Sequence, residues 1–147
     1  MRDIKKMFWI NLVIVVGLIA IVTIRSVTGD GPGTDFVLSA DGLTISGPDN
    51  FSASIEFKDV VSIEFREEFD RGRCITGGNE GKITYGIWEN DEFGEYSLYV
   101  LTKVDACMIL EGSGGDIIVF NIENAKNTQA FTENLIEYLQ GKGYLSP

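Results

Sequence analysis

Residues Met7 to Ile24 form an uninterrupted stretch without a charged side chain, and most of them are large and apolar. As an α-helix, these 18 residues would extend roughly 27 Å at about 1.5 Å per residue, close to the ~30 Å hydrocarbon core of a bilayer. A helix buried in a soluble domain would be expected to show a polar face, and this stretch has none. The sequence therefore predicts a single transmembrane helix over residues 7–24.

Basic residues flank the predicted helix unequally. Three of them lie in residues 1–6, and one follows the helix closely. Because Lys and Arg accumulate on the cytoplasmic side of membrane helices, we expect a cytoplasmic N-terminus and a domain on the outer face. Long basic side chains and aromatic rings are typical of the two interfaces. The predicted membrane-flanking residues are Lys5, Lys6, Trp9 and Arg25.

A cleaved signal peptide is the alternative to a permanent anchor. Signal peptides usually have an apolar region of about 7–15 residues followed by a small-residue cleavage site. The apolar stretch here is longer, and the best candidate site, Val27-Thr28-Gly29, matches poorly. We therefore expect an uncleaved signal anchor. Residues 25–34 contain three glycines and a proline, which predicts a short linker without regular structure.

The chain after the predicted helix is strongly acidic. Four of the 12 Lys and Arg residues flank the helix and one of the 22 Asp and Glu residues precedes it, so 8 basic and 21 acidic residues follow, for a net charge near −13. This charge repels nucleic acid and anionic lipid headgroups. A cationic partner, a neutral ligand or a metal ion fits the domain better. Alternatively, the negative charge serves only to keep the domain soluble.

The residue types that usually carry catalysis are scarce. The sequence has no histidine, the common general base near pH 7, and it has neither a nucleophile motif nor a complete phosphate-binding loop. We therefore expect no enzyme activity and no cofactor. Cys74 and Cys107 lack the spacing of a metal or redox motif, but an outer-face domain would permit a disulfide between them.

Two clusters of charged residues are interpreted as surface features and not as catalytic or metal sites. An acidic turn contains Asp91, Glu92 and Glu95, but Phe93 stands where a calcium loop would need an oxygen ligand. We interpret it as a solvated turn and predict no metal site. Carboxylates around Arg66 are interpreted as partners in ion pairs at a strand edge rather than as acid–base catalysts.

Residues 35–143 are predicted to form one domain that consists mainly of β-strands. Short segments alternate apolar and polar residues, as in 51–57 and 61–66, which indicates strands with one buried and one wet face. We expect about seven antiparallel strands, with 67–81 as a charged connection. After Asn124, a plausible N-cap, the period changes to that of an amphipathic helix, which ends near Gly141.

A family resemblance is carried by the order of strands followed by one C-terminal helix and by segments 43–45, 55–64, 71–72, 85–88, 94–100 and 119–121. In these features the chain resembles the bacterial pleckstrin-homology-like (PH-like) domain families, which occur in small membrane-tethered proteins. The resemblance implies a bent antiparallel β-barrel capped by the helix, and a binding or scaffolding module without a specified ligand. One departure concerns the first hairpin, 39–42, which is tight and acidic; it argues against phosphoinositide binding.

The function that we predict is a single-pass, membrane-anchored module that recruits a protein or peptide partner. The expected site is a groove between a sheet edge and the C-terminal helix, where a partner segment would add as a strand. The apolar helix residues Leu135, Tyr138 and Leu139 are expected to belong to the core. The alternatives are a small-ligand-binding β-barrel, for which the interior would need an open cavity, and a structural subunit of a membrane complex.

Overall fold

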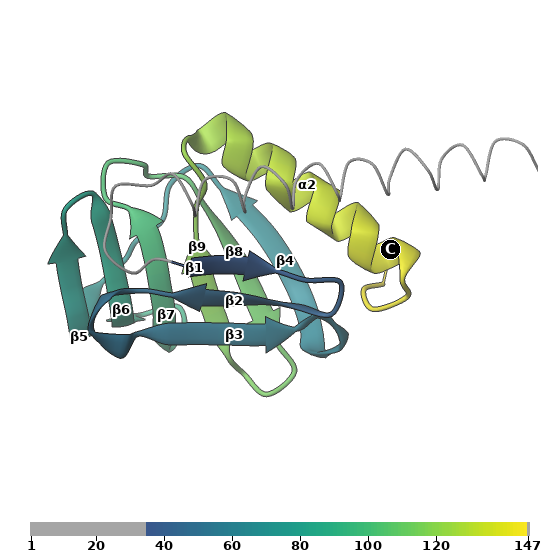
Figure 1. Ribbon diagram of the computed structural model, residues 1–147, viewed down its shortest axis with the longest axis horizontal. Helices are drawn as coiled ribbons and strands as arrows, with labels where there is room; N and C mark the ends of the chain where they lie inside the picture. The colour runs from purple at the N-terminus through teal and green to yellow at the C-terminus, as the bar shows by residue number, and fades with distance from the viewer. Residues whose placement is uncertain (1–34, 147) are drawn as a thin grey trace, which may run out of the picture.

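The computed structural model describes residues 35–146 (Figure 1). The predicted transmembrane helix, its flanking residues and the linker over 25–34 lie outside the described residues. Within 35–146, no helix is both long enough and apolar enough to cross a membrane. The elements are β1 (Asp35–Leu38), β2 (Gly42–Ser46), η1 (Pro48–Asn50), β3 (Ser52–Glu56), η2 (Phe57–Asp59), β4 (Val60–Arg66), β5 (Arg73–Glu80), β6 (Ile83–Asn90), β7 (Gly94–Leu101), β8 (Cys107–Gly112), β9 (Ile117–Phe120) and α2 (Ala125–Gly141).

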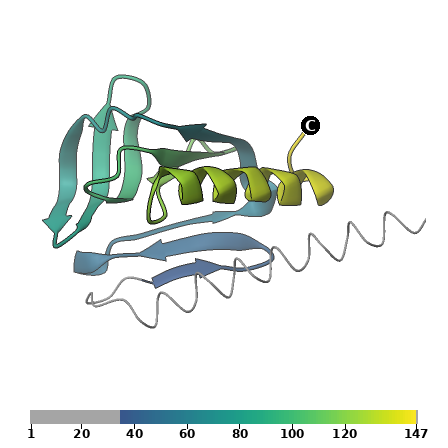
Figure 2. The same ribbon diagram turned by 90° about the horizontal axis from the view of Figure 1, so that it is seen from above.

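The strands form two separate sheets. The small sheet has the order β1-β2-β3, and the large sheet has the order β4-β8-β9-β7-β6-β5. The two sheets form distinct layers, and α2 runs alongside them (Figures 1 and 2). The prediction of a mainly-β domain with a C-terminal helix is thus confirmed. The prediction of a closed, all-antiparallel barrel is wrong, because the sheets remain separate and β7 pairs with β9 in parallel.

Apolar and polar residues alternate along β2 and β3, and this alternation determines which face of the small sheet is buried. Leu43, Ile45 and Ile55 point into the protein and are at most 8% exposed, whereas Thr44 and Ser54 lie between them on the other face. The inward side chains join a core that also includes residues of the large sheet and of α2. Burying one face of a sheet against another layer is the main source of its stability.

The centre of the large sheet is buried on both faces. All four residues of β9 are buried, with Ile118 and Phe120 in the core shared with α2 and Ile117 and Val119 in a second cluster. The second cluster is covered in part by the connection between β4 and β5, from which Phe69 packs against it. Because β4 and β5 occupy opposite borders of the sheet, this connection must cross the sheet face.

The predicted charged connection over 67–81 is partly wrong, because its second half forms the border strand β5. Its first half is held by Tyr96, whose hydroxyl donates to the carbonyl of Arg71 (2.5 Å), and by the Asn90 amide, which donates to the carbonyl of Asp70 (2.8 Å). β5 was not predicted because it is exposed along its length and lacks alternating apolar residues.

The prediction for the C-terminal helix is confirmed at both ends. The Asn124 side chain accepts a hydrogen bond from the Asn127 N–H (2.8 Å), which is an N-cap. Phe131, Leu135 and Leu139 are at most 6% exposed and pack in the first core. The stripe spaced by three and four residues therefore fixes the helix on the sheets.

Candidate functional site

Within residues 35–146, β2 is the only strand that pairs with β3, so the small sheet has a free edge along β3. The Gly47 N–H donates to the Phe51 carbonyl and the Phe57 N–H donates to the Asp41 carbonyl, both at 2.8 Å. Hydrogen-bonded residues alternate in an antiparallel pair, so the odd-numbered residues of β3 bond to β2. The residues whose backbone N–H and C=O groups point away from β2 are Ser52, Ser54 and Glu56, and all three are exposed.

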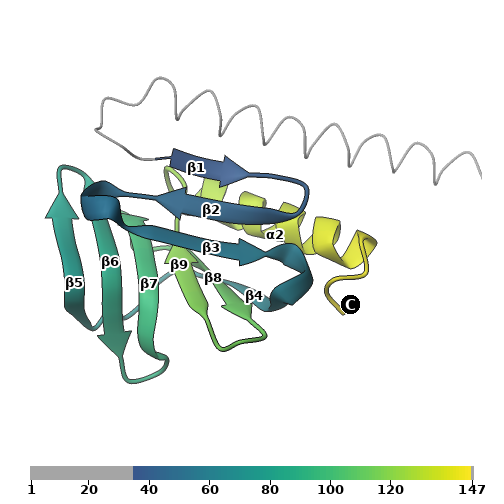
Figure 3. The ribbon, with the colours of Figure 1, turned by 60° about the horizontal axis from the view of Figure 1, so that its bottom comes forward.

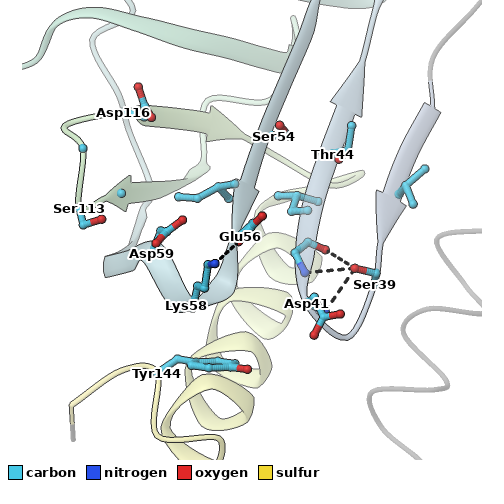
Figure 4. Close-up of a pocket in the computed structure, with 16 residues that line it drawn as sticks. Ser39, Asp41, Thr44, Ser54, Glu56, Lys58, Asp59, Ser113, Asp116 and Tyr144 are labelled. Atoms are coloured by element: carbon cyan, nitrogen blue, oxygen red, sulfur yellow. Dashed lines mark hydrogen bonds and ion pairs between the residues drawn. The ribbon is translucent and has the colours of Figure 1, made fainter.

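A groove follows this free edge. One hollow, of about 880 Å³, lies along β2, β3 and the turn between β8 and β9 (Figure 4). A second hollow, of about 340 Å³, is lined by residues of β3, β6, β7 and β9. The two hollows share Ser54 and Asp116, so together they extend along the free edge of β3. Figure 3 shows the β3 side of the small sheet facing the strands of the large sheet.

The wall opposite β3 is held by hydrogen bonds. The Gly112 N–H donates to the carbonyl of Asp116 (2.8 Å) and closes the β8–β9 turn. The Ser113 N–H donates to the carbonyl of Asp59 (2.7 Å), which ties the turn to η2. Ser113 and Asp116 lie across the groove from β3 in Figure 4. The groove is therefore open between two fixed walls.

The groove is acidic. Among the described residues that line the two hollows, Lys58 is the only basic one, and its Nζ lies 2.9 Å from a carboxylate oxygen of Glu56. The Glu56 carboxylate raises the pKa of Lys58, so this ammonium group stays charged and paired. Exposed apolar side chains, Val37 and Tyr144, also line the larger hollow. The acidic lining residues are Asp41, Glu56, Asp59, Glu95 and Asp116.

The groove predicted between a sheet edge and α2 is filled. Leu38, Phe57 and Tyr138 line a hollow of about 20 Å³ there, which has room for about one water molecule. The Tyr138 hydroxyl also donates to the carbonyl of Ala40 (3.0 Å) and joins the helix to the first hairpin. A partner strand does not fit at this position. Leu135 and Leu139 are core residues, as predicted.

The structure does not bring Cys74 and Cys107 together. Both are free thiols; Cys74 is exposed on β5 and Cys107 is buried on β8. Three strands separate β5 from β8, so at about 4.8 Å per strand spacing the two lie roughly 19 Å apart, whereas a disulfide needs a Cα–Cα distance below about 7 Å. Burial raises the pKa of the Cys107 thiol to about 12, which makes it unreactive at neutral pH.

The charged clusters form ion pairs. Arg66 on β4 lies 2.8 Å from Glu64 and 2.5 Å from Glu92 in the turn between β6 and β7. These contacts raise the pKa of Arg66 and lower that of Glu92. The guanidinium also lies 5.6 Å from the ring centre of Phe93. Among residues 35–146, no group of three or more Cys, Asp or Glu side chains is placed to hold a metal ion.

Comparisons with protein-family models, with curated proteins and with solved structures found no match. The resemblance to PH-like families therefore stays a prediction that depends on the segments quoted above. The open groove lies along the edge of β3, whereas the sequence prediction placed a groove between a sheet edge and α2. The one available signal was the pattern Ser52, Ser54 and Glu56, which places polar side chains on one face of β3 but does not show that the strand lacks a second neighbour.

Proposed function

We propose that this chain is a non-catalytic, single-pass membrane-anchored module that recruits a protein partner by adding an extended segment of that partner to the free edge of β3. The observation that carries the proposal is the row of outward backbone groups at three alternate residues of β3, beside an open groove. Main-chain hydrogen bonds supply affinity in this mode of recognition, and side-chain pockets supply specificity. The proposal does not depend on the PH-like resemblance.

The free edge of β3 is more regular than the borders of the large sheet. Exposed strand edges invite unwanted pairing, and proteins often interrupt them with bulges or glycines. β5 has a register shift between Cys74 and Thr76 and two glycines, Gly77 and Gly78, with positive φ. β4 has a register shift between Val60 and Ser62. By contrast, β3 pairs with β2 without interruption, which leaves an unbroken template for another strand.

The groove suits a strand in position and chemistry. An added strand would lie about 4.8 Å from β3, and its side chains would alternate between the two faces of the small sheet. Inward side chains would meet the second hollow, which Ile87 and Ile118 line from the face of the large sheet that points toward β3. Outward side chains would lie beside Ser54 and Glu56. Side chains fill the two cores, which favours this open edge over an interior cavity for a small ligand.

A proline at position 54 tests the proposal. The N–H of Ser54 points away from β2, so Ser54→Pro removes a donor that an added strand would use while leaving the β2–β3 ladder bonds in place. Ser54→Ala is the matched control because it keeps the N–H. The probe is a neutral peptide of about seven alternating Gln and Val residues, added to the full chain in zwitterionic nanodiscs. Melting curves of both variants check that the domain stays folded.

We expect Ser54→Pro to weaken peptide binding by about tenfold or more and Ser54→Ala by less than about twofold. In the unsubstituted chain, amide hydrogen exchange at Ser52, Ser54 and Glu56 should slow when the peptide binds. Peptide binding that leaves these three amides unprotected, or that is equal in both variants, would contradict strand addition at β3.

A further inference from the structure

The chemistry of the groove specifies the partner segment more closely. Building on the strand addition proposed above, we infer that the recruited segment is a cationic stretch of a protein, in which Lys or Arg residues face outward and alternate with apolar residues that face inward. The free edge determines that the segment is extended. The distribution of charge and apolar surface along the two walls determines its sequence pattern.

The outward face of the groove favours positive charge. Glu56 belongs to β3 itself, and Asp59 and Asp116 border the same hollow (Figure 4). Lys58, the one basic residue among the described residues of the lining, is exposed and already paired with Glu56, so an incoming cation meets an excess of carboxylates. Side chains directly opposite each other on neighbouring strands stabilise the pair when their charges are opposite and destabilise it when they are alike.

The inward face favours apolar side chains. The second hollow lies on the side of β3 where Ala53 points into the protein, and Ile87, Ile118 and the small Ser97 line it from the large sheet. Glu95 and Asp116 also line this hollow and add negative charge there. Because side chains alternate along a strand, one segment satisfies both faces with a repeat of two residues.

The net negative charge of the whole domain also favours a cationic segment. The chain after residue 25 carries 21 acidic and 8 basic residues, so a cationic segment is attracted from a distance and an acidic one is repelled. This long-range attraction depends on salt, whereas the backbone hydrogen bonds of the added strand depend on it little. The two contributions can therefore be separated by experiment.

The experiment compares three capped peptides of about seven residues, in which Val alternates with Lys, with Gln or with Glu. Each is titrated into the full chain in zwitterionic nanodiscs at low and high salt. We expect the Lys peptide to bind about tenfold more tightly than the Gln peptide and the Glu peptide to bind more weakly than both. The preference for Lys should shrink as the salt concentration rises from about 50 to about 500 mM.

Variants of the groove locate the effect. Glu56→Gln and Asp116→Asn should each weaken binding of the Lys peptide severalfold and leave the Gln peptide within about twofold. Glu133→Gln is the matched control, because this exposed glutamate lies on α2 and does not line either hollow. It should affect neither peptide. Equal loss in all three variants would show that only overall charge matters and would overturn the inference.

The outcomes distinguish this inference from the function on which it rests. If the Lys and Gln peptides bind equally and both are sensitive to Ser54→Pro, strand addition stands and the cationic preference is wrong. If the Lys peptide binds equally to the Ser54→Pro variant, and a Lys peptide N-methylated at alternate residues binds as well as the parent, then charge alone attracts it and strand addition fails. If none of the peptides binds, both proposals are overturned.

Discussion

The pairing of β5 with β6 depends on two glycines that face each other. Gly77 and Gly86 are register partners, with φ values of +107° and +119°. A Cβ atom on Gly86 would lie 2.0 Å from the carbonyl oxygen of Thr76 and 2.8 Å from the Cα of Gly77. Both are backbone atoms, so they cannot move aside as a flexible side chain would. Gly86→Ala should therefore force the two strands apart.

The expected cost has two parts. A backbone with positive φ costs a residue other than glycine about 1–3 kcal/mol, and inserting a methyl group into a closely packed site costs about 1–3 kcal/mol more. The sum is about 2–6 kcal/mol, a large fraction of the 5–15 kcal/mol that is typical of a domain. Gly81→Ala isolates the first part, because Gly81 has φ +60° and no atom within 4 Å of its added Cβ. That control should cost only about 1–2 kcal/mol.

Urea unfolding of the full chain in mild detergent, followed by near-ultraviolet circular dichroism, measures both free energies. Gly86→Ala should be less stable than Gly81→Ala by at least about 1 kcal/mol. The same variant should speed amide exchange throughout β5, because β6 is the only strand within residues 35–146 that pairs with this border strand. A free energy of unfolding equal in the two variants would refute the close approach of β5 and β6 as the source of the requirement for glycine.

Three further predictions concern single side chains. Asn124→Ala should lower the unfolding free energy by about 1 kcal/mol through loss of the α2 cap, measured by urea unfolding, whereas no loss would show that the cap is not formed. Cys74 should react with a maleimide in the folded chain and Cys107 only after urea unfolding, so equal labelling of both before unfolding would contradict the burial of Cys107. Tyr85 donates to the Asp49 carboxylate, which raises the pKa of its hydroxyl from 10.0 to about 12. The stability that this raised pKa supplies is present below pH 10 and is lost as the pH rises towards 12, so the stability advantage over Tyr85→Phe should shrink across that range; a constant advantage would contradict it.

The parts of the fold that could be predicted from sequence depend on local signals. Alternation in 51–57 and the change of period after Asn124 each lie within one segment, because the buried face of a strand or helix is determined by its own side chains. Asn124 identifies the helix start through the hydrogen bond that it makes within one turn. These local features appear in the structure at nearly the predicted residues.

The large sheet could not be predicted because its pairing is non-local. β4 pairs with β8, whose residues lie more than 40 positions later, and β7 pairs in parallel with β9. Short apolar runs indicate that β8 and β9 are strands but do not determine which strands they pair with. The predicted antiparallel barrel came from the resemblance to PH-like families and not from the residues of these strands. The exposed strand β5 has no apolar pattern to reveal it.

The candidate site exists because β4 pairs with β8 and not with β3. At η2 the chain still contacts β2, because the Phe57 N–H donates to the Asp41 carbonyl, and the buried Phe57 ring fixes the turn in the core. After Asp59 the chain leaves the small sheet, and β4 pairs with β8 instead of continuing beside β3. A closed barrel would have used the outward backbone groups of β3 internally. Because the chain passes from the small sheet to the large sheet after Asp59, no barrel forms and the outward backbone groups of β3 remain available to a partner strand. The second wall of the groove beside them is the Ser113–Asp116 turn of the large sheet.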